Sequence, residues 1–193
     1  PQKNNDTIFD FDNDPIQAYV HGEWVTAKGT TLGADNGIGV AAAMAILADK
    51  TVVHPPLEVL ITVDEETGMY GAFALEGGLL QGKTLLNLDS EAEGELYVGC
   101  AGGVDTTAKF HYTPVEVEEG DIAIKVTLKG CKGGHSGCDI HLQRANANKL
   151  LFRFLKDAVA NYEARLAYIE GGSLRNAIPR EATAIITIPA EGI

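Results

Sequence analysis

The sequence lacks several features that would identify a class of protein at once. Its cysteines are few and odd in number (Cys100, Cys131 and Cys138), and no CxxC pair occurs. A disulfide framework or a cysteine zinc site is therefore not expected, and reduced thiols of a cytoplasmic protein are the simpler interpretation. No apolar run approaches the ~18 residues of a membrane span. The polar start, PQKNND, lacks the apolar core of a signal peptide.

Basic residues are also scarce. The chain of 193 residues has 15 Lys and Arg against 27 Asp and Glu, which gives a net charge of −12. Nucleic-acid binding and docking to an anionic membrane both need clustered positive charge, so neither partner is expected. An excess of carboxylates suits a cation instead. The hydrophobic fraction of 45% is enough for a buried core in one or two domains.

The first half of the chain alternates between helical and strand patterns. The expected elements are a hairpin at 16–28, a buried helix at 37–49, a strand at 57–63, a helical stretch at about 69–80 and a strand at 84–89. Such alternation is typical of an α/β fold with a mostly parallel sheet covered by helices.

The pattern changes after Ala101-Gly102-Gly103. Period-two alternation predicts strands at 104–112 and 121–129, helical spacing predicts a helix at 145–160, and a further strand is expected at 182–189. Strands that frame an amphipathic helix predict a small α+β open-faced sandwich. We therefore expect two domains, 1–103 and 104–193.

Acidic residues stand at comparable places in the predicted α/β part. Asp35 precedes the 37–49 helix, Glu65 and Glu66 follow the 57–63 strand, and Asp89 ends the 84–89 strand. Carboxylates that meet at one sheet edge repel one another unless a cation binds. A divalent metal site is one interpretation. Alternatively, Asp35 is a helix cap, Glu65-Glu66 a solvated turn and Asp89 the start of a loop.

The adjacent pair Glu65-Glu66 has a further implication. If this segment is extended, consecutive side chains point to opposite sides. One carboxylate can then face a metal while the other accepts a proton from water.

A competing pattern is the dinucleotide fingerprint GxGxxG/A. Residues 37–42 (GIGVAA) fit it, and Asp64 follows at a suitable distance. The fingerprint must follow a buried strand, but a polar loop, GTTLGADN, precedes these glycines. Asp35 would also repel a pyrophosphate, so a dinucleotide-binding domain is disfavoured.

Taken together, the motifs resemble those of the carnosinase-type zinc exopeptidases, and most of all the bacterial aminoacyl-histidine (Xaa-His) dipeptidases. The matching segments are LGADNGIG (32–39), DEETGM (64–69), LDSE (88–91), GGHSG (133–137) and RNAIPRE (175–181). The resemblance implies part of the catalytic zinc-exopeptidase sheet sandwich in 1–103 and part of a lid or dimerisation domain in 104–193.

The resemblance also implies roles for the acidic residues. Asp35 would bridge two zinc ions, and its peptide bond to Asn36 would be cis. Glu66 and Asp89 would each complete the carboxylates of one metal. Glu65 would be the general base.

In the smaller domain, the resemblance implies that His135 and Asn176 bind the scissile carbonyl or its oxyanion. In such enzymes the histidine often acts from the partner subunit of a homodimer. Without the resemblance, His135 is a loop histidine among turn glycines and Asn176 a turn residue.

The sequence departs from the family pattern in two places. A His-x-Asp motif upstream of Asp35 and a ligand histidine downstream of the smaller domain are not found. We therefore expect a di-zinc peptidase that acts on Xaa-His dipeptides in the complete protein, and weak zinc binding by this chain. A dimerisation fragment without catalysis is the alternative.

Overall fold

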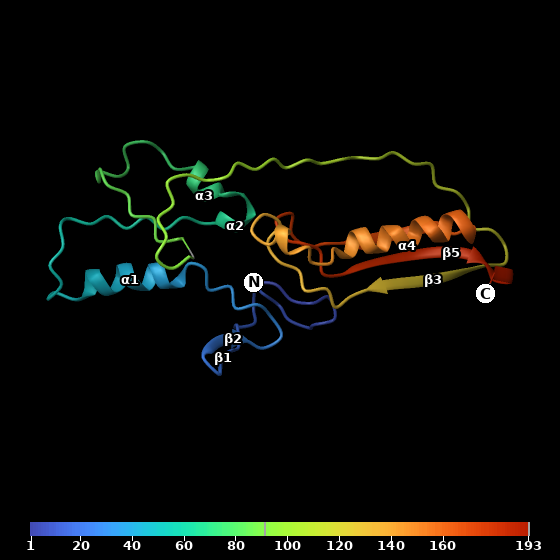
Figure 1. Cartoon of the computed structure of the whole chain (residues 1–193), viewed down its shortest axis with the longest axis horizontal. Helices are drawn as coiled ribbons and strands as arrows, with labels where there is room; N and C mark the ends of the chain where they lie inside the picture. The colour runs from blue at the N-terminus through green and yellow to red at the C-terminus, as the bar shows by residue number, and fades with distance from the viewer. Residues whose placement is uncertain (91, 193) are drawn as a thin grey trace. The chain divides into compact units, whose positions relative to one another are not determined.

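The computed structural model describes residues 1–90 and 92–192. The chain divides into two compact units, Pro1–Gly102 and Gly103–Ile193. Figure 1 shows the helices and strands of both units. The mixed α/β class expected from the sequence is confirmed, but all strand pairs among the described residues are antiparallel, so the mostly parallel sheet expected in the first half is wrong. The catalytic and lid roles assigned to 1–103 and 104–193 stay predictions.

The first unit contains a hairpin and a helix that the sequence predicted. Strands β1 (Ala18–His21) and β2 (Trp24–Ala27) pair antiparallel. Gly22, at φ +64, occupies the two-residue turn, where a left-handed backbone favours glycine. Helix α1 (Gly37–Ala48) follows. It is apolar all round, because Ala, Ile, Leu and Met fill almost every position. None of its residues is buried, so the helix is confirmed and its expected burial is wrong.

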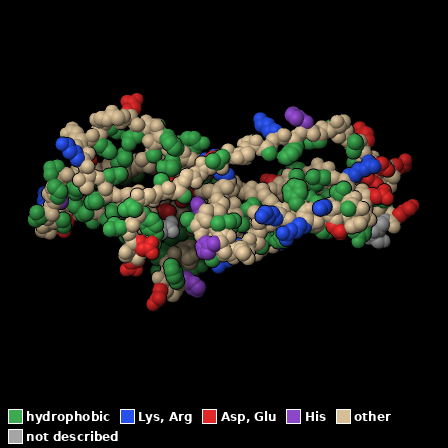
Figure 2. Space-filling view, turned by 45° about the horizontal axis from the view of Figure 1, so that its top comes forward, with side chains coloured by type: hydrophobic (Ala, Val, Ile, Leu, Met, Phe, Trp, Pro, Cys, Tyr) green, Lys and Arg blue, Asp and Glu red, His purple; other side chains and the backbone are tan. Residues whose placement is uncertain are grey.

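Three other predictions for the first unit are wrong. The expected helix at 69–80 is limited to the short helix α3 (Tyr70–Phe73), which follows α2 (Glu65–Gly68). Residues 57–63 and 84–89 form no strand. A strand needs a neighbour for its backbone N–H and C=O groups, and an apolar run does not specify that neighbour. Their side chains remain exposed, as do many hydrophobic side chains (green in Figure 2).

The second unit is an open-faced sandwich, as predicted. Its three strands, in the order β3-β5-β4, all pair antiparallel, and helix α4 packs on the sheet. The elements are β3 (Asp121–Leu128), the 3-10 turn η1 (Ile140–Leu142), α4 (Ala147–Asn161), β4 (Arg165–Gly171), β5 (Ala182–Pro189) and the 3-10 turn η2 (Ala190–Gly192).

Two features of the second unit differ from the prediction. Residues 104–112 form no strand, and Val104 and Phe110 are 92% and 86% exposed. Their period-two pattern indicates two faces but provides no partner. The edge strand β4 was not predicted. Its residues are mostly exposed, so hydrophobic alternation gives little signal there.

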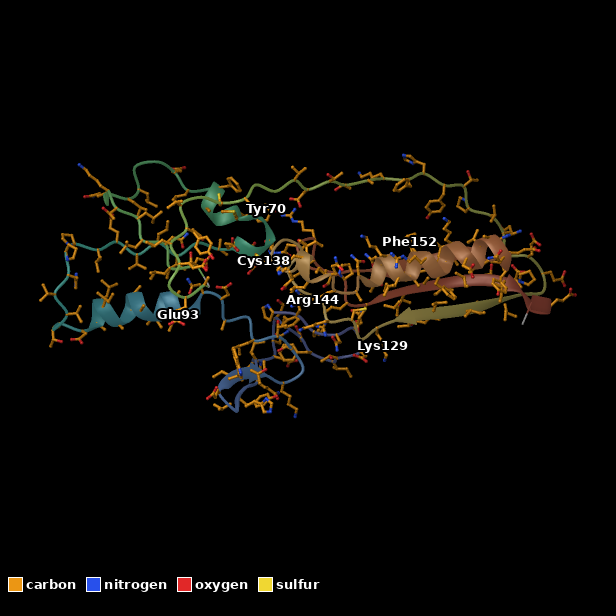
Figure 3. The ribbon with its side chains drawn as sticks, viewed as in Figure 1. Tyr70, Glu93, Lys129, Cys138, Arg144 and Phe152 are labelled. Carbon is orange, nitrogen blue, oxygen red and sulfur yellow. The ribbon has the colours of Figure 1, made fainter. Side chains whose placement is uncertain are left out.

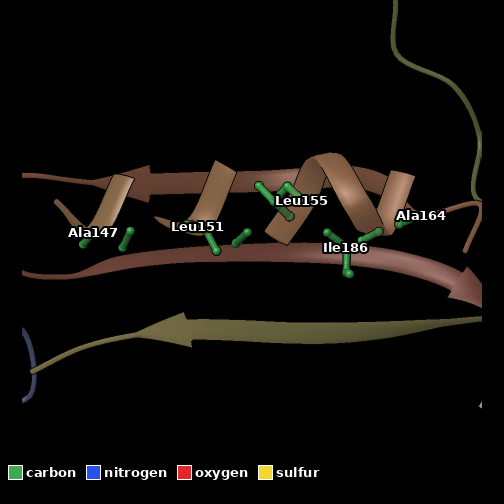
Figure 4. Close-up of a cluster of buried hydrophobic side chains, with 8 residues drawn as sticks. Ala147, Leu151, Leu155, Ala164 and Ile186 are labelled. Carbon is green, nitrogen blue, oxygen red and sulfur yellow. The ribbon is translucent and has the colours of Figure 1, made fainter. Parts of the chain in front are cut away.

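The core lies between α4 and the central strand β5 (Figure 4). Leu151 and Leu155 are 1% and 5% exposed, and they pack with Ala184 and Ile186. Helix α4 begins where the Asn146 side chain accepts a hydrogen bond from the Lys149 N–H, at 3.1 Å. Within residues 1–90 and 92–192, no helix has the length and apolar character needed to cross a membrane.

We predict that Leu151→Ala destabilises the second unit by about 2–5 kcal/mol, because the substitution leaves a cavity between α4 and β5. The neighbouring Phe152, labelled in Figure 3, is 56% exposed. Phe152→Ala is the matched control on the same helix and should cost much less. Urea unfolding followed by circular dichroism measures both. Equal losses would contradict the packing described here.

Candidate functional site

The segment around Asp35 is held by its neighbour Asn36. The peptide bond between them is cis, as the resemblance implied. The Asn36 side chain accepts a hydrogen bond from the Gly39 N–H at 2.9 Å and donates one to the Leu88 carbonyl oxygen at 2.8 Å. Asn36 therefore caps α1, and the alternative that Asp35 is the cap is wrong. The bond to Leu88 brings the segment of Asp35 beside that of Asp89.

The glycines after Asn36 serve the start of the helix. A Cβ at Gly39 would lie 2.7 Å from Asn36 Nδ2, so a side chain there would displace the capping amide. Residues 31–34 are not in a strand. The dinucleotide fingerprint requires a strand at that place, so this alternative is not supported.

Glu65 and Glu66 lie in the first turn of α2, not in an extended segment. Asp64, at φ +58, turns the chain into this helix. Consecutive side chains on a helix are about 100° apart, so the expected projection to opposite sides is wrong. Acidic groups in a first helical turn are favoured by the helix dipole. Their roles as base and ligand stay predictions.

The described residues do not assemble a metal centre. Across residues 1–90 and 92–192, no group of three or more His, Cys, Asp or Glu side chains is placed to hold a metal ion. Asp35, Glu66 and Asp89 supply carboxylates only. Glu91, the last residue of the LDSE motif, lies outside the described residues.

In the second unit, the loops that carry His135 and Asn176 lie side by side. Leu128 pairs with Ala182 at the ends of β3 and β5, and the pairing continues as an isolated bridge between His135 and Ala177. The Ser136 N–H donates to the Asn176 carbonyl oxygen at 2.8 Å. The structure therefore brings together the two residues that the sequence assigned to carbonyl binding.

The imidazole of His135 makes defined hydrogen bonds. Its Nδ1 accepts from the N–H groups of Gly137 and Cys138, at 3.0 and 3.1 Å. The ring itself is exposed. A substrate atom can therefore reach it while its orientation is held by the backbone.

Two residues that the sequence analysis missed support this loop. Asp139 Oδ2 accepts from the His135 N–H at 2.9 Å and lies 3.1 Å from Arg144 Nη1. Arg144 also donates to the Gly133 carbonyl oxygen at 2.8 Å. The spacing of Asp139 four residues after His135 was an available signal, because short polar side chains often bond to nearby backbone. Nothing local indicated Arg144.

A pocket of about 470 Å³ adjoins these loops in the second unit. Its polar lining comes from both loops and from the start of α4: Ser136, Asn146, Asn148, Ser173 and Arg175. Arg175 also forms an ion pair with Asp105 at 3.1 Å. The pocket offers hydrogen-bond donors and one guanidinium, which suits a small polar or anionic group.

Comparison with known proteins gives a consistent result. Residues 126–192 match the peptidase dimerisation domain family. The chain is 58% identical over 193 residues to the cytosol non-specific dipeptidase of Escherichia coli (strain K12), covering 100% of this chain and 40% of that protein. It is 32% identical over 123 residues to the uncharacterized protein YqjE of Bacillus subtilis (strain 168), covering 59% of this chain and 33% of that protein.

A solved structure is also similar. The crystal structure of aminoacylhistidine dipeptidase from Vibrio alginolyticus matches with a TM-score of 0.51 and 58% identity, covering 99% of this chain and 39% of that one. The chain therefore spans about 40% of the length of each of these dipeptidases.

We predict that Gly134→Ala disrupts the His135 loop. Gly134 has φ +142, and a Cβ would lie 2.3 Å from Arg144 Nη1 and 2.5 Å from Asp139 Oδ2. The loss should be roughly 1–3 kcal/mol from the backbone, plus the loss of the contacts to both side chains. Gly130→Ala is the matched control, because Gly130 has φ +86 but open space around it. Urea unfolding compares them, and an equal loss in both variants would refute the close contact.

Proposed function

Because this chain is related along its whole length to the aminoacylhistidine dipeptidases, we propose that the protein carrying it is a di-zinc metallopeptidase that hydrolyses Xaa-His dipeptides. The observation that carries the proposal is the 58% identity to the aminoacylhistidine dipeptidase over 99% of this chain. The contact between the His135 and Asn176 loops supports the proposal, because two residues that bind the same scissile carbonyl must lie close together.

In this proposal Glu65 is the general base. Its carboxylate, in the first turn of α2 and exposed, accepts a proton from the water that attacks the peptide carbonyl carbon. When the C–N bond breaks, Glu65 returns that proton to the leaving amine. The water oxygen and its second hydrogen remain on the new carboxyl group, which then releases that proton, so atoms and charges balance.

His135 and Asn176 are proposed to bind the carbonyl oxygen as negative charge develops on it. Preorganised donors at such a position lower the barrier, because they need no reorientation during the reaction. The backbone bonds of the His135 ring and the bond between Ser136 and Asn176 provide this preorganisation.

The two zinc ions rest on the resemblance. Asp35, Glu66 and Asp89 would be the carboxylate ligands, and the ions would activate the attacking water. Catalytic zinc generally has three protein ligands, with histidine common among them. Three carboxylates are too few to give each of two ions three protein ligands. The described residues also contain no group of three or more His, Cys, Asp or Glu placed to hold a metal ion. The proposal therefore requires further ligands for both ions.

We predict that Glu65→Gln lowers kcat for an Xaa-His dipeptide by about 100-fold or more, because a general base contributes that much. The measurement uses the natural protein that carries this sequence, with its zinc content determined by mass spectrometry. The matched control is Glu76→Gln, at an exposed acidic residue of the same unit. Full activity in the Glu65 variant would exclude the base assignment.

A second candidate function is dimerisation by the smaller unit without catalysis. The match of residues 126–192 to a peptidase dimerisation domain favours it. Strands β3 and β4 are the edges of the described sheet, so their outer backbone groups can pair with a second copy. The dipeptidase proposal also includes a homodimer that pairs through this unit.

We predict that sedimentation equilibrium of this chain shows a mass that rises with concentration toward twice its 20.5 kDa. Leu166→Lys, on exposed β4, should abolish the rise if the edge pairs, since an edge lysine opposes strand addition. Phe154→Lys, on the exposed side of α4, tests the helix instead. A monomer at all concentrations would count against dimerisation.

The cytoplasm is the proposed location. The relative from Escherichia coli is named a cytosol dipeptidase, and Cys100, Cys131 and Cys138 are free thiols here. Free thiols are typical of a reducing compartment.

A further inference from the structure

The ring nitrogens of His135 have different environments. Nδ1 accepts hydrogen bonds from two backbone N–H groups, those of Gly137 and Cys138. An atom that accepts from two N–H groups cannot carry a hydrogen itself. In the neutral ring the hydrogen must then be on Nε2. Nε2 has no hydrogen-bond partner among residues 1–90 and 92–192, so its N–H is available to a ligand.

The turn that aims these two N–H groups is closed by Asp139. The Asp139 N–H donates to the His135 carbonyl oxygen at 3.0 Å, and Asp139 Oδ2 accepts from the His135 N–H at 2.9 Å. Two hydrogen bonds therefore join His135 and Asp139, the residues at the two ends of the turn. The second of these hydrogen bonds depends on the position of the Asp139 carboxylate.

Arg144 holds that carboxylate. Its Nη1 lies 3.1 Å from Asp139 Oδ2 and donates to the Gly133 carbonyl oxygen at 2.8 Å, on the other side of His135. The side chains of Arg144 and Asp139 are only 20% and 28% exposed, so water competes less for this pair than for a surface ion pair. Figure 3 labels Cys138 and Arg144, which come shortly before and after the 3-10 turn η1.

We propose that Asp139 and Arg144 are positioning residues that hold the 135–139 turn and thereby fix His135 as its Nε2–H tautomer, a hydrogen-bond donor toward the ligand. The role of that donor at a peptide carbonyl rests on the proposed function. The tautomer and its dependence on the ion pair do not.

This assignment restricts the chemistry of His135. In a neutral imidazole with hydrogen on Nε2, the Nδ1 lone pair faces the two backbone N–H groups, so a ligand meets the Nε2–H. His135 is then a donor to oxygen atoms, such as a carbonyl, an oxyanion or a carboxylate. His54 offers an internal contrast, because its Nδ1 lies 2.7 Å from the Pro55 carbonyl oxygen and must carry the hydrogen there.

The test is a long-range ¹H–¹⁵N correlation spectrum of the ¹⁵N-labelled 193-residue chain near pH 8, where a free imidazole is neutral. His135→Gln assigns the signal by its loss. We expect an unprotonated Nδ1 and a protonated Nε2 for His135. We expect averaged nitrogen shifts for the exposed His111. A protonated Nδ1 at His135 in the unsubstituted chain would overturn the tautomer assignment directly.

Substitutions test the positioning role. Asp139→Asn and Arg144→Gln should move the His135 nitrogen shifts toward those of His111, whereas Arg144→Lys should restore them in part, since one ammonium can reach both partners. Arg153→Gln, the same change at an exposed position of α4, is the matched control. Circular dichroism identifies any variant that does not fold. Unchanged His135 shifts in a folded Asp139→Asn or Arg144→Gln variant would refute the role of the pair.

The enzyme assay is kept separate. In the natural protein that carries this chain, Arg144→Gln should lower kcat by roughly tenfold, as loss of an orienting partner does, with a smaller change in KM. If no Xaa-His dipeptide is hydrolysed by the unsubstituted protein, the proposed function fails while the spectra still decide the tautomer. If hydrolysis occurs but Arg144→Gln matches the Arg153→Gln control, the positioning role in catalysis fails.

Discussion

The antiparallel register between β3 and β5 is the constraint on which the second unit depends. Strand β5 lies in the centre of the sheet, because it pairs with β3 on one side and β4 on the other, and it receives the buried side of α4. The β3–β5 register also determines which residues meet beyond the strand ends. From Leu128↔Ala182 the two chains continue side by side to the bridge between His135 and Ala177. A slip of one residue would place different side chains opposite each other and separate His135 from Asn176.

Elements with a local cause were predictable from the sequence. The hairpin at 16–28 has alternating residues around a turn, α4 has apolar residues at helical spacing, and the segment of α1 is rich in Ala and other apolar residues. Predictions that needed a distant partner succeeded only in part, because the strands predicted at 121–129 and 182–189 pair as β3 and β5 whereas others do not form. Residues 57–63 and 104–112 have strand-like composition, but a strand exists only through hydrogen bonds to a neighbour. The alternation of apolar and polar residues indicates which face of a strand is buried, but it does not identify the neighbouring strand.

The candidate site divides in the same way. Asp35, Glu65, Glu66, Asp89, His135 and Asn176 were found because each belongs to a short motif. The contacts that support them were not, since Leu88 lies 52 residues from its partner Asn36 and Arg144 lies 11 residues from Gly133. The geometry of Glu65-Glu66 was misjudged for a related reason. An extended chain was assumed after a strand that is not formed, and the left-handed Asp64 starts a helix there instead.

The hydrogen bonds of His135 bear on how the proposed reaction distributes its proton transfers. Two backbone N–H groups occupy Nδ1, so the neutral ring can only donate through Nε2. Amide groups such as that of Asn176 do not accept protons near neutral pH. Among the residues proposed to act on the substrate, a carboxylate alone can take the proton from water and return it to the amine. The proposed base is therefore a carboxylate, while its assignment to Glu65 in particular rests on the motif in which Glu65 was recognised and stays a prediction.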